Sequence, residues 1–301
     1  MFQDPIYNQK VNIPNSSIEL VIKREDLIHP FVSGNKFRKL KYNIKQAKTT
    51  RLRPILTFGG AFSNHIAAVA FAGKEHGVPT IGIIRGEELG LKKHLNPTLQ
   101  FAKLNGMQLK FVSRDDYKKK THSEFLSLLK DEFGAFYMLP EGGTNNLAVK
   151  GCEEILQPID YTYDYVCCAV GTGGTIAGLI NASKEHQKIL GFPALKGDFL
   201  QEDIRKFANR DNWKLLTDYH FGGYGKIKPE LISFINTFKK NHNIPLDPIY
   251  TGKMLFGIFD RIANGYFPEN SKILAIHTGG LQGIAGMNEM LKRKKSPLIE
   301  V

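Results

Sequence analysis

The stretch DYVCCAVGTGGTIAG, residues 164–178, decides the fold class of this chain. Its apolar first half predicts a buried β-strand, and the glycine-rich turn that follows leads into a predicted helix. In an α/β sheet, such a turn presents backbone N–H groups beside a helix N-terminus, where an anion is favoured. Glycines let the backbone approach an anion closely, and hydroxyls add donors. The predicted phosphate-binding residues are Gly171, Thr172, Gly173, Gly174 and Thr175.

This turn differs from two widespread phosphate-binding motifs. The dinucleotide fingerprint requires glycine at position 176, where this chain has Ile176. A P-loop requires a lysine followed by serine or threonine, and no such pair follows here. A tight strand-to-helix turn without a ligand explains the glycines equally well, so the turn alone leaves the ligand open.

The rest of the chain alternates short apolar runs with amphipathic stretches, a pattern typical of an α/β protein with a mainly parallel sheet. At 301 residues, the chain is long enough for two subdomains or for one large domain. The predicted strands are residues 18–23, 54–58, 80–84, 108–112, 164–170, 189–194 and 272–277. The predicted helices are residues 35–48, 63–76, 95–105, 122–133, 147–157, 174–185, 228–241, 253–264 and 280–294.

Composition places the chain among ordinary globular proteins. The hydrophobic fraction is 42% and the charged fraction is 23%. No stretch approaches the roughly 18 apolar residues of a membrane span, and no apolar segment typical of a secretory signal follows Asp4. The three cysteines, Cys152, Cys167 and Cys168, are odd in number and offer neither a disulfide framework nor metal spacing. We therefore expect buried thiols, a reducing cytoplasmic location and no membrane partner.

The net charge of +12 raises the hypothesis of nucleic-acid binding. However, the lysines and arginines form short dispersed clusters that are typical of solvated helix faces. No zinc-finger spacing or RNA-binding aromatic run accompanies them. We expect no nucleic-acid partner, and attribute the charge to attraction of an anionic substrate or cofactor.

Lys36, in the run SGNKFRKL (33–40), is a candidate reactive amine. Like-charge repulsion from Arg38, Lys39 and Lys41 would lower its pKa, which helps a lysine that forms a Schiff base. The same group of charges is equally typical of a solvated helix face. Lys36 alone therefore does not establish a site.

Other loops add candidate residues. GGAFSNH (59–65) follows a strand and opens a helix, so its N–H groups could bind a carboxylate, although capping by Ser63 or Asn64 explains it as well. Tyr224 and Tyr250 each lie in a glycine-rich loop, where packing and chemistry are both possible roles. Neither His65 nor His277 belongs to a metal-binding spacing, so we predict no metal.

A reactive lysine, an asparagine-bearing turn and a phosphate cradle, in this order, are what a protein needs to hold pyridoxal 5′-phosphate (PLP). The chain resembles the 1-aminocyclopropane-1-carboxylate (ACC) deaminase/D-cysteine desulfhydrase family of fold type II (tryptophan-synthase-β-like) PLP enzymes. The matching segments run in family order: KREDL (23–27), SGNKFRKL (33–40), GGAFSNH (59–65), PEGGTN (140–145), VGTGGTIAG (170–178), DPIYTGK (247–253) and IHTGG (276–280).

The resemblance implies an α/β fold of two subdomains with twisted, mainly parallel sheets flanked by helices, and PLP in the cleft between them. The larger subdomain would combine residues 1–45 with 151–301, and the smaller would cover residues 46–150. The resemblance also implies a homodimer that acts on a small amino acid.

For the cofactor, the resemblance implies that Lys36 is the Schiff-base lysine and that residues 171–175 hold the phosphate. Asn64 matches the asparagine that contacts the 3′-oxygen of PLP. Thr251 and Thr278 stand at the positions close to the pyridine nitrogen, and the sequence leaves open which of them contacts it.

For the substrate, the resemblance implies that Ser63 lies nearby and that Asn64 and His65 continue the loop that receives its carboxylate. Tyr224 and Tyr250 match the two active-site tyrosines, with their separate roles open. The expected catalytic residues are Lys36, Ser63, Tyr224 and Tyr250.

The informative departures concern Thr251 and Thr278, where the deaminase branch has glutamate and leucine. A glutamate beside the pyridine nitrogen would keep it protonated and strengthen the electron sink. A hydroxyl leaves the nitrogen closer to neutral, which suffices for β-elimination but suits cyclopropane ring opening less well. Phe37 replaces a small polar residue common after the lysine, so the substrate preference could differ from both named activities.

The sequence thus predicts a PLP-dependent lyase that performs α,β-elimination on D-cysteine or a near relative, giving pyruvate, ammonia and sulfide. One alternative is ACC deaminase activity, giving 2-oxobutyrate and ammonia. A second is a PLP-binding protein with little turnover, which serves as a sensor or reservoir.

Overall fold

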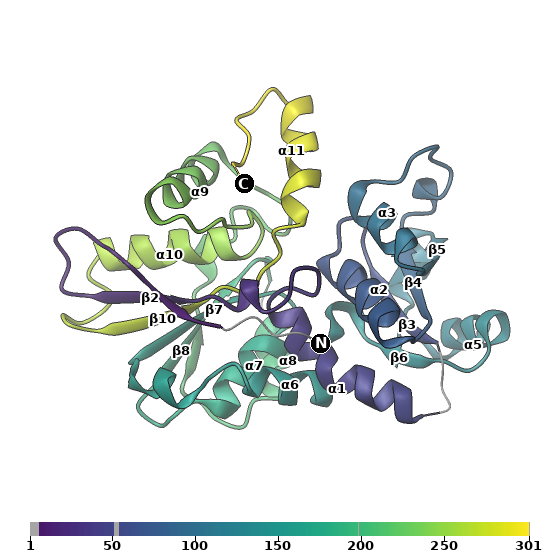
Figure 1. The fold of residues 1–301 in the computed structure, drawn as a ribbon, viewed down its shortest axis with the longest axis horizontal. Coiled ribbons are helices and arrows are strands. Elements are labelled where there is room, and N and C mark those ends of the chain that lie inside the picture. Colours follow the sequence, from purple (N-terminus) through teal and green to yellow (C-terminus); the bar gives the residue numbers. More distant parts are fainter. Residues whose placement is uncertain (1–5, 51–53, 198, 301) are drawn as a thin grey trace.

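Two β-sheets flanked by helices form the protein (Figure 1). The computed structural model describes residues 6–50, 54–197 and 199–300. The strands are β1 (Asn8–Val11), β2 (Glu19–Lys23), β3 (Ile55–Gly59), β4 (Thr80–Arg85), β5 (Gln108–Val112), β6 (Tyr137–Leu139), β7 (Tyr165–Val170), β8 (Lys188–Pro193), β9 (Trp213–Leu215) and β10 (Lys272–Ile276). The α-helices are α1 (Asn35–Thr49), α2 (Asn64–His76), α3 (Pro97–Leu104), α4 (Arg114–Lys118), α5 (Ser123–Phe133), α6 (Asn146–Glu153), α7 (Gly174–Ala182), α8 (Phe199–Arg205), α9 (Pro229–His242), α10 (Thr251–Ala263) and α11 (Gly283–Arg293).

The larger sheet has the strand order β1-β2-β10-β7-β8-β9, and only the β1–β2 pair is antiparallel. In Figure 1, α9 and α10 lie above this sheet and α6 and α7 lie below it. Side chains along β7 alternate between the two layers. Cys167 and Ala169 belong to the core that includes α10 residues, whereas Val166, Cys168 and Val170 belong to the core that includes α7 residues. Burial on both faces explains the nearly continuous apolar run of this strand.

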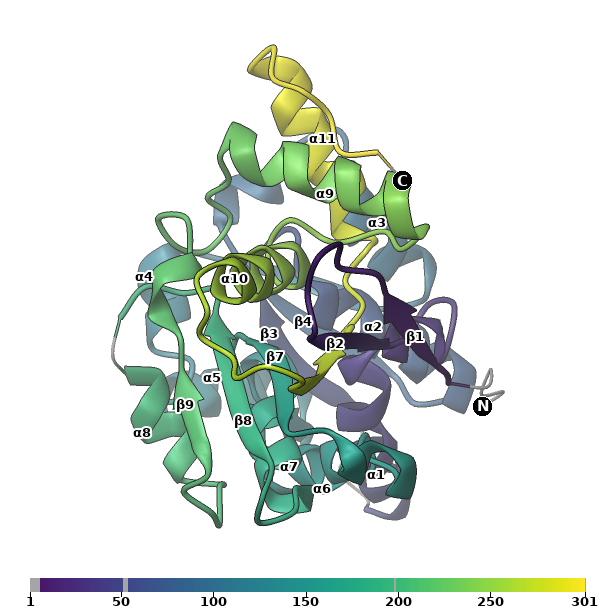
Figure 2. The same ribbon diagram turned by 90° about the vertical axis from the view of Figure 1, so that its left-hand side faces the viewer.

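The smaller sheet has the order β5-β4-β3-β6 and is parallel throughout. Residues of α2 and α3 share one core with Ile55 and Ile84, and residues of α4 and α5 share another with Leu56 and Phe58. In Figure 2, the strands β3 and β4 lie behind those of the larger sheet. Each sheet takes its strands from only one of the two expected subdomain segments. The boundaries of those subdomains stay a prediction.

The α/β fold class with mainly parallel sheets is confirmed, and every predicted strand is present to within one residue at each end. Strands β1, β6 and β9 are not predicted. Each has three or four residues and lies at the edge of a sheet, so its alternation of apolar and polar residues is too short to predict a strand. The helices α4 and α8 are also not predicted, because five and seven residues are too few for a helical period.

Two predicted helices end three or four residues earlier than expected. The helix predicted at 147–157 ends at Glu153, and that predicted at 174–185 ends at Ala182, where the Ser183 hydroxyl donates to the Ile180 carbonyl. Other ends follow their sequence signals, since Ser63 accepts a hydrogen bond from the Ile66 amide at the start of α2.

All three cysteines are buried and carry free thiols, as expected. No helix within the described residues has the length and apolar character needed to span a bilayer.

Candidate active site

A cavity of about 1010 Å³ lies where the carboxyl ends of strands from both sheets meet. Residues that follow β3 and β4 form one wall, and residues that follow β7 and β10 form the other. The predicted site residues that line this cavity are Lys36, Ser63, Asn64, His65, Gly171, Thr172, Gly173, Thr175, Tyr224, Tyr250 and Thr278. Residues as far apart in the sequence as Lys36 and Thr278 are thus brought to one site.

Lys36 is placed by the close approach of two backbone segments. Gly34 has a φ of 60°, and a Cβ atom there would lie 2.0 Å from the Thr278 carbonyl oxygen. Only glycine fits at this contact, which sets the start of α1 against the loop after β10. The Lys36 Nζ atom donates to Asn35 Oδ1 at 3.2 Å, and Asn35 in turn donates to Thr175 Oγ1 at 2.8 Å. The amine is therefore tied to the glycine-rich turn.

Burial, with a smaller contribution from the charge of Lys39, lowers the pKa of Lys36 to about 7. The expectation that Arg38 and Lys41 contribute is wrong, because carboxylates pair with both. Arg38 forms two hydrogen bonds of 2.9 Å with buried Glu25, and Lys41 pairs with Glu154 at 2.5 Å. A large fraction of Lys36 amines is thus neutral near pH 7 and able to act as a nucleophile or base.

The glycine-rich turn meets a buried ammonium that the sequence patterns do not single out for this role. Lys39 lies one turn after Lys36 and donates to the Gly142 carbonyl and to Thr144 Oγ1, both at 3.0 Å. A Cβ atom on Gly174 would lie 3.2 Å from Lys39 Nζ, so the amine stands against the first turn of α7. A positive charge and the free N–H groups of a helix N-terminus converge here, which favours a dianion.

The first turn of α2 presents two buried polar atoms without a partner among the described residues, Asn64 Oδ1 and His65 Nδ1. Because Thr57 donates its hydroxyl proton to the Leu139 carbonyl, it accepts from His65 Nε2 at 2.8 Å. His65 Nδ1 is therefore an unprotonated acceptor. Burial holds the pKa of His65 well below its usual value, so the ring is neutral.

Tyr224 and Tyr250 face each other at the cavity, with ring centroids 6.2 Å apart in an edge-to-face arrangement. Burial raises the pKa of both hydroxyls. The hydrogen bond between them raises the pKa of Tyr250 further and opposes the rise for Tyr224. Tyr224 is thus the more acidic of the pair, and both are protonated at neutral pH.

The two threonines near the expected position of the pyridine ring have different surroundings. Thr251 is fully buried, and its hydroxyl contacts the backbone amide and Oδ1 of Asp247 at 3.0 and 2.8 Å. Asp247 also accepts from the amides of residues 249–251, which ties down the start of α10. Thr278 lines the cavity. The structure thus leaves the Thr278 hydroxyl available to a ligand and engages that of Thr251.

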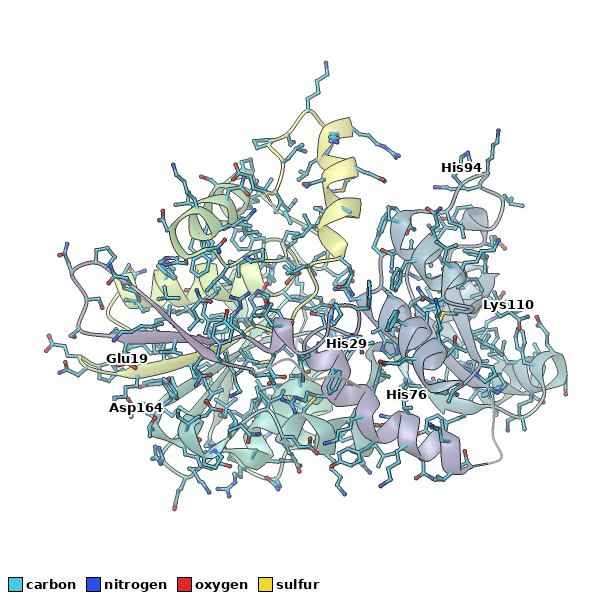
Figure 3. All side chains as sticks on the ribbon, in the orientation of Figure 1. Glu19, His29, His76, His94, Lys110 and Asp164 are labelled. Carbon is cyan, nitrogen blue, oxygen red and sulfur yellow. The ribbon has the colours of Figure 1, made fainter. Side chains whose placement is uncertain are left out.

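The remaining histidines do not build a metal centre. His277 Nδ1 accepts from the Gly279 amide, and its Nε2 donates to the Pro245 carbonyl at 2.7 Å, so this ring is a structural link. Figure 3 shows His29 and His76 beside α1 and α2, with His94 far from both at the periphery. Across residues 6–50, 54–197 and 199–300, no group of three or more His, Cys, Asp and Glu side chains could hold a metal.

Comparison with known proteins decides the family. Residues 7–279 match the family described as "Pyridoxal-phosphate dependent enzyme". The chain belongs to this family. Its cofactor is therefore PLP, and the chain is an enzyme of the ACC deaminase/D-cysteine desulfhydrase group within it.

Three relatives of this PLP enzyme illustrate the group. A Pyrococcus horikoshii protein, provisionally named an ACC deaminase, is 31% identical, with 90% of this chain and 88% of the relative covered. The mitochondrial bifunctional D-cysteine desulfhydrase/ACC deaminase of Arabidopsis thaliana is 29% identical over 90% of this chain and 74% of the relative. The crystal structure of an ACC deaminase homologue is 28% identical, covers 97% of this chain and 94% of its own, and superposes with a TM-score of 0.82. The type II fold is thereby confirmed.

The residues present fit PLP. Lys39 and the α7 N-terminus converge on one point that suits a phosphate, and Lys36, with its lowered pKa, lies on the same helix as Lys39. The partnerless Asn64 oxygen belongs to a side chain whose amide nitrogen is also close to the cavity wall, 3.0 Å from the Cβ position of Gly280. A ligand that hydrogen-bonds with Asn64 would satisfy this buried group.

Proposed function

We propose that this PLP enzyme is a lyase that removes sulfide and ammonia from D-cysteine and releases pyruvate. The observation that carries the proposal is the absence of a spare carboxylate in the part of the cavity wall that the structure describes. Its carboxylates are already engaged: Glu88 by Arg114, Glu141 by Tyr117 and Lys120, and Asp203 by Lys206. The pyridine nitrogen would then face the hydroxyl of Thr278 and not a carboxylic acid.

When bound, PLP supplies an electron sink that spreads the negative charge left by removal of the α-proton. We assign Lys36 to hold the cofactor, with residues 171–175 and Lys39 on its phosphate and Asn64 on its 3′-oxygen. We assign Thr278 to the pyridine nitrogen, because the hydroxyl of Thr251 is engaged by Asp247.

The same residues account for the proton transfers. Once a substrate amine takes the place of Lys36, the neutral Lys36 amine is able to accept the α-proton. The N–H groups at the start of α2, including that of His65, suit the substrate carboxylate together with Ser63 and Asn64; the His65 ring itself is an unprotonated acceptor and donates nothing to it. Tyr224, as the more acidic tyrosine, donates a proton to the departing thiolate, and Tyr250 supports it by hydrogen bonding.

A second candidate is ACC deaminase activity, which the names of the Pyrococcus and Arabidopsis relatives favour. The threonines at 251 and 278 argue for desulfhydration, since the weaker electron sink that a hydroxyl leaves suits cyclopropane ring opening less well. The cytoplasmic location stays a prediction. We also expect a homodimer by family resemblance, and light scattering of the purified protein tests it.

The experiment is an absorbance spectrum of the PLP-loaded protein before and after addition of D-cysteine, with pyruvate and sulfide assayed in the same sample. Spectral change with both products supports the proposal. Release of 2-oxobutyrate and ammonia from ACC, without products from D-cysteine, would establish the second candidate instead. Full turnover by Lys36→Ala would contradict the assignment of Lys36, and a spectral change without product from any amino acid would indicate a PLP-binding protein with little turnover.

A further inference from the structure

Helix α10 contacts the loop that carries Tyr224 through a buried lysine. Tyr250 is the N-cap residue of α10, and Lys253 lies in its first turn with 1% of its surface exposed. Lys253 Nζ donates to the carbonyl oxygens of His220 at 2.8 Å and Gly223 at 3.0 Å. One helix therefore carries one tyrosine and binds the backbone just before the other.

The loop depends on such bonds because its own packing is sparse. Phe221, Gly222, Gly223 and Gly225 all have φ between 55° and 113°, a region that costs most residues conformational energy. A Cβ atom on Gly225 would meet nothing within 4 Å. The recorded ring contacts of the loop are both with α10: Phe221 contacts Phe256, with centroids 5.1 Å apart, and Tyr224 contacts the N-cap residue Tyr250, with centroids 6.2 Å apart.

The charge of Lys253 is not explained by an ion pair. Within the described chain, the recorded partners of its Nζ atom are the two carbonyl oxygens, and neither is a carboxylate. Asp247 acts on Lys253 electrostatically, but its oxygens are bound to residues 249–251. Burial lowers the pKa of Lys253 to about 8, so folding a protonated amine here is unfavourable. A methionine would fill the same space without this cost.

We propose that Lys253 is a positioning residue that holds residues 220–223 against α10 and thereby keeps the Tyr224 hydroxyl beside Tyr250 at the cavity. This inference rests on the proposed function in one respect, the proton that Tyr224 donates. The binding of the loop by Lys253 does not depend on the reaction.

Hydrogen exchange of the cofactor-free protein tests the loop directly. The Gly223 and Lys226 amides donate to the same two carbonyls that Lys253 binds, at 3.0 and 3.1 Å. In the unaltered protein, they should exchange at least about tenfold more slowly than in an unfolded peptide. Lys253→Met should remove this protection, whereas Lys214→Met, at an exposed position on β9, should retain it. Exchange at the unfolded rate in the unaltered protein would overturn the proposal without any variant.

Kinetics of the PLP-loaded enzyme test the consequence. Since small displacements of a reacting group cost on the order of a hundredfold in rate, Lys253→Met should lower kcat by roughly that factor, with little change in KM or PLP affinity. In the background of Tyr224→Phe, the same change should have no further effect on kcat, because the two residues act through one group.

The outcomes separate the two ideas. Additive losses in the double variant, or loss of PLP affinity in step with kcat, would mean that Lys253 acts structurally and not through Tyr224. Full activity of Tyr224→Phe would refute the role of that tyrosine in the proposed function, while the exchange data would still decide whether Lys253 holds the loop.

Discussion

Replacement of Lys39 by methionine tests the phosphate site most sharply. The change keeps the length of a side chain that is 3% exposed but removes its charge beside the N-terminus of α7. A hydrogen bond to a charged group contributes about 1.5–3 kcal/mol, and each 1.4 kcal/mol changes an affinity tenfold. Lys39→Met should therefore weaken PLP binding by about 10- to 100-fold.

In Lys39→Met, the thermal stability of the cofactor-free protein should not fall along with the affinity for PLP. Burial lowers the pKa of Lys39, so the unfolded chain binds its proton more tightly than the folded protein does, and the protonated lysine disfavours folding at neutral pH. Removal of this cost opposes the loss of the hydrogen bonds to Gly142 and Thr144, so the thermal midpoint of cofactor-free Lys39→Met should change little.

The assay is a PLP titration followed by absorbance, paired with thermal unfolding of the cofactor-free protein. Lys45→Met is the matched control, because Lys45 is an exposed lysine on the same helix. Unchanged PLP affinity in Lys39→Met, or a loss of affinity explained by a lower midpoint, would refute the reasoning.

Three further predictions follow from buried contacts. Because burial lowers the pKa of Lys36 to about 7, the rate of PLP uptake should rise with pH around a midpoint near 7 as the amine loses its proton, and a stopped-flow midpoint near the usual lysine value of 10.5 would contradict this. Thr278→Val should change the absorbance of bound PLP with little loss of stability. Thr251→Val should instead lower the free energy of unfolding by about 1–3 kcal/mol, because it removes two hydrogen bonds from the buried end of α10. Equal effects of the two changes on the spectrum would argue against the assignment of Thr278. Glu25→Gln removes the buried carboxylate that binds Arg38 through two hydrogen bonds and leaves only Glu154, at 3.8 Å, so denaturant titration should show a loss of about 3–5 kcal/mol. A loss below about 1 kcal/mol would show that this pair does not stabilise the start of α1.

The sequence predicts the strands and helices that are long enough to show a hydrophobic periodicity. The run at 164–170 is apolar throughout because both faces of β7 are covered, and its turn leads into α7 as predicted. The edge strands β1, β6 and β9 were not predicted, because a strand of three or four residues that pairs with only one other strand needs little alternation of apolar and polar side chains. Their place is set by pairing with distant strands, which local patterns do not encode.

The sequence motifs of the candidate site could be predicted, but the contacts between its side chains could not. Lys36, the loop at 59–65 and the turn at 171–175 stand out by composition, and all of their residues except Gly59 and Gly174 line one cavity. Lys39 and Lys253 resemble any other lysine on a helix, and only the folded chain reveals that both are buried against carbonyl oxygens. Sequence spacing also attributed the lowered pKa of Lys36 to its charged neighbours, although burial is the larger cause.

Borohydride reduction of the PLP-loaded protein, followed by peptide mass mapping, tests the central claim most directly. Reduction fixes the cofactor on the amine that holds it, and the account predicts a single modified peptide with the label on Lys36. The label on Lys39, or on any other lysine, would contradict the assignment of the reactive amine and with it the proposed reaction.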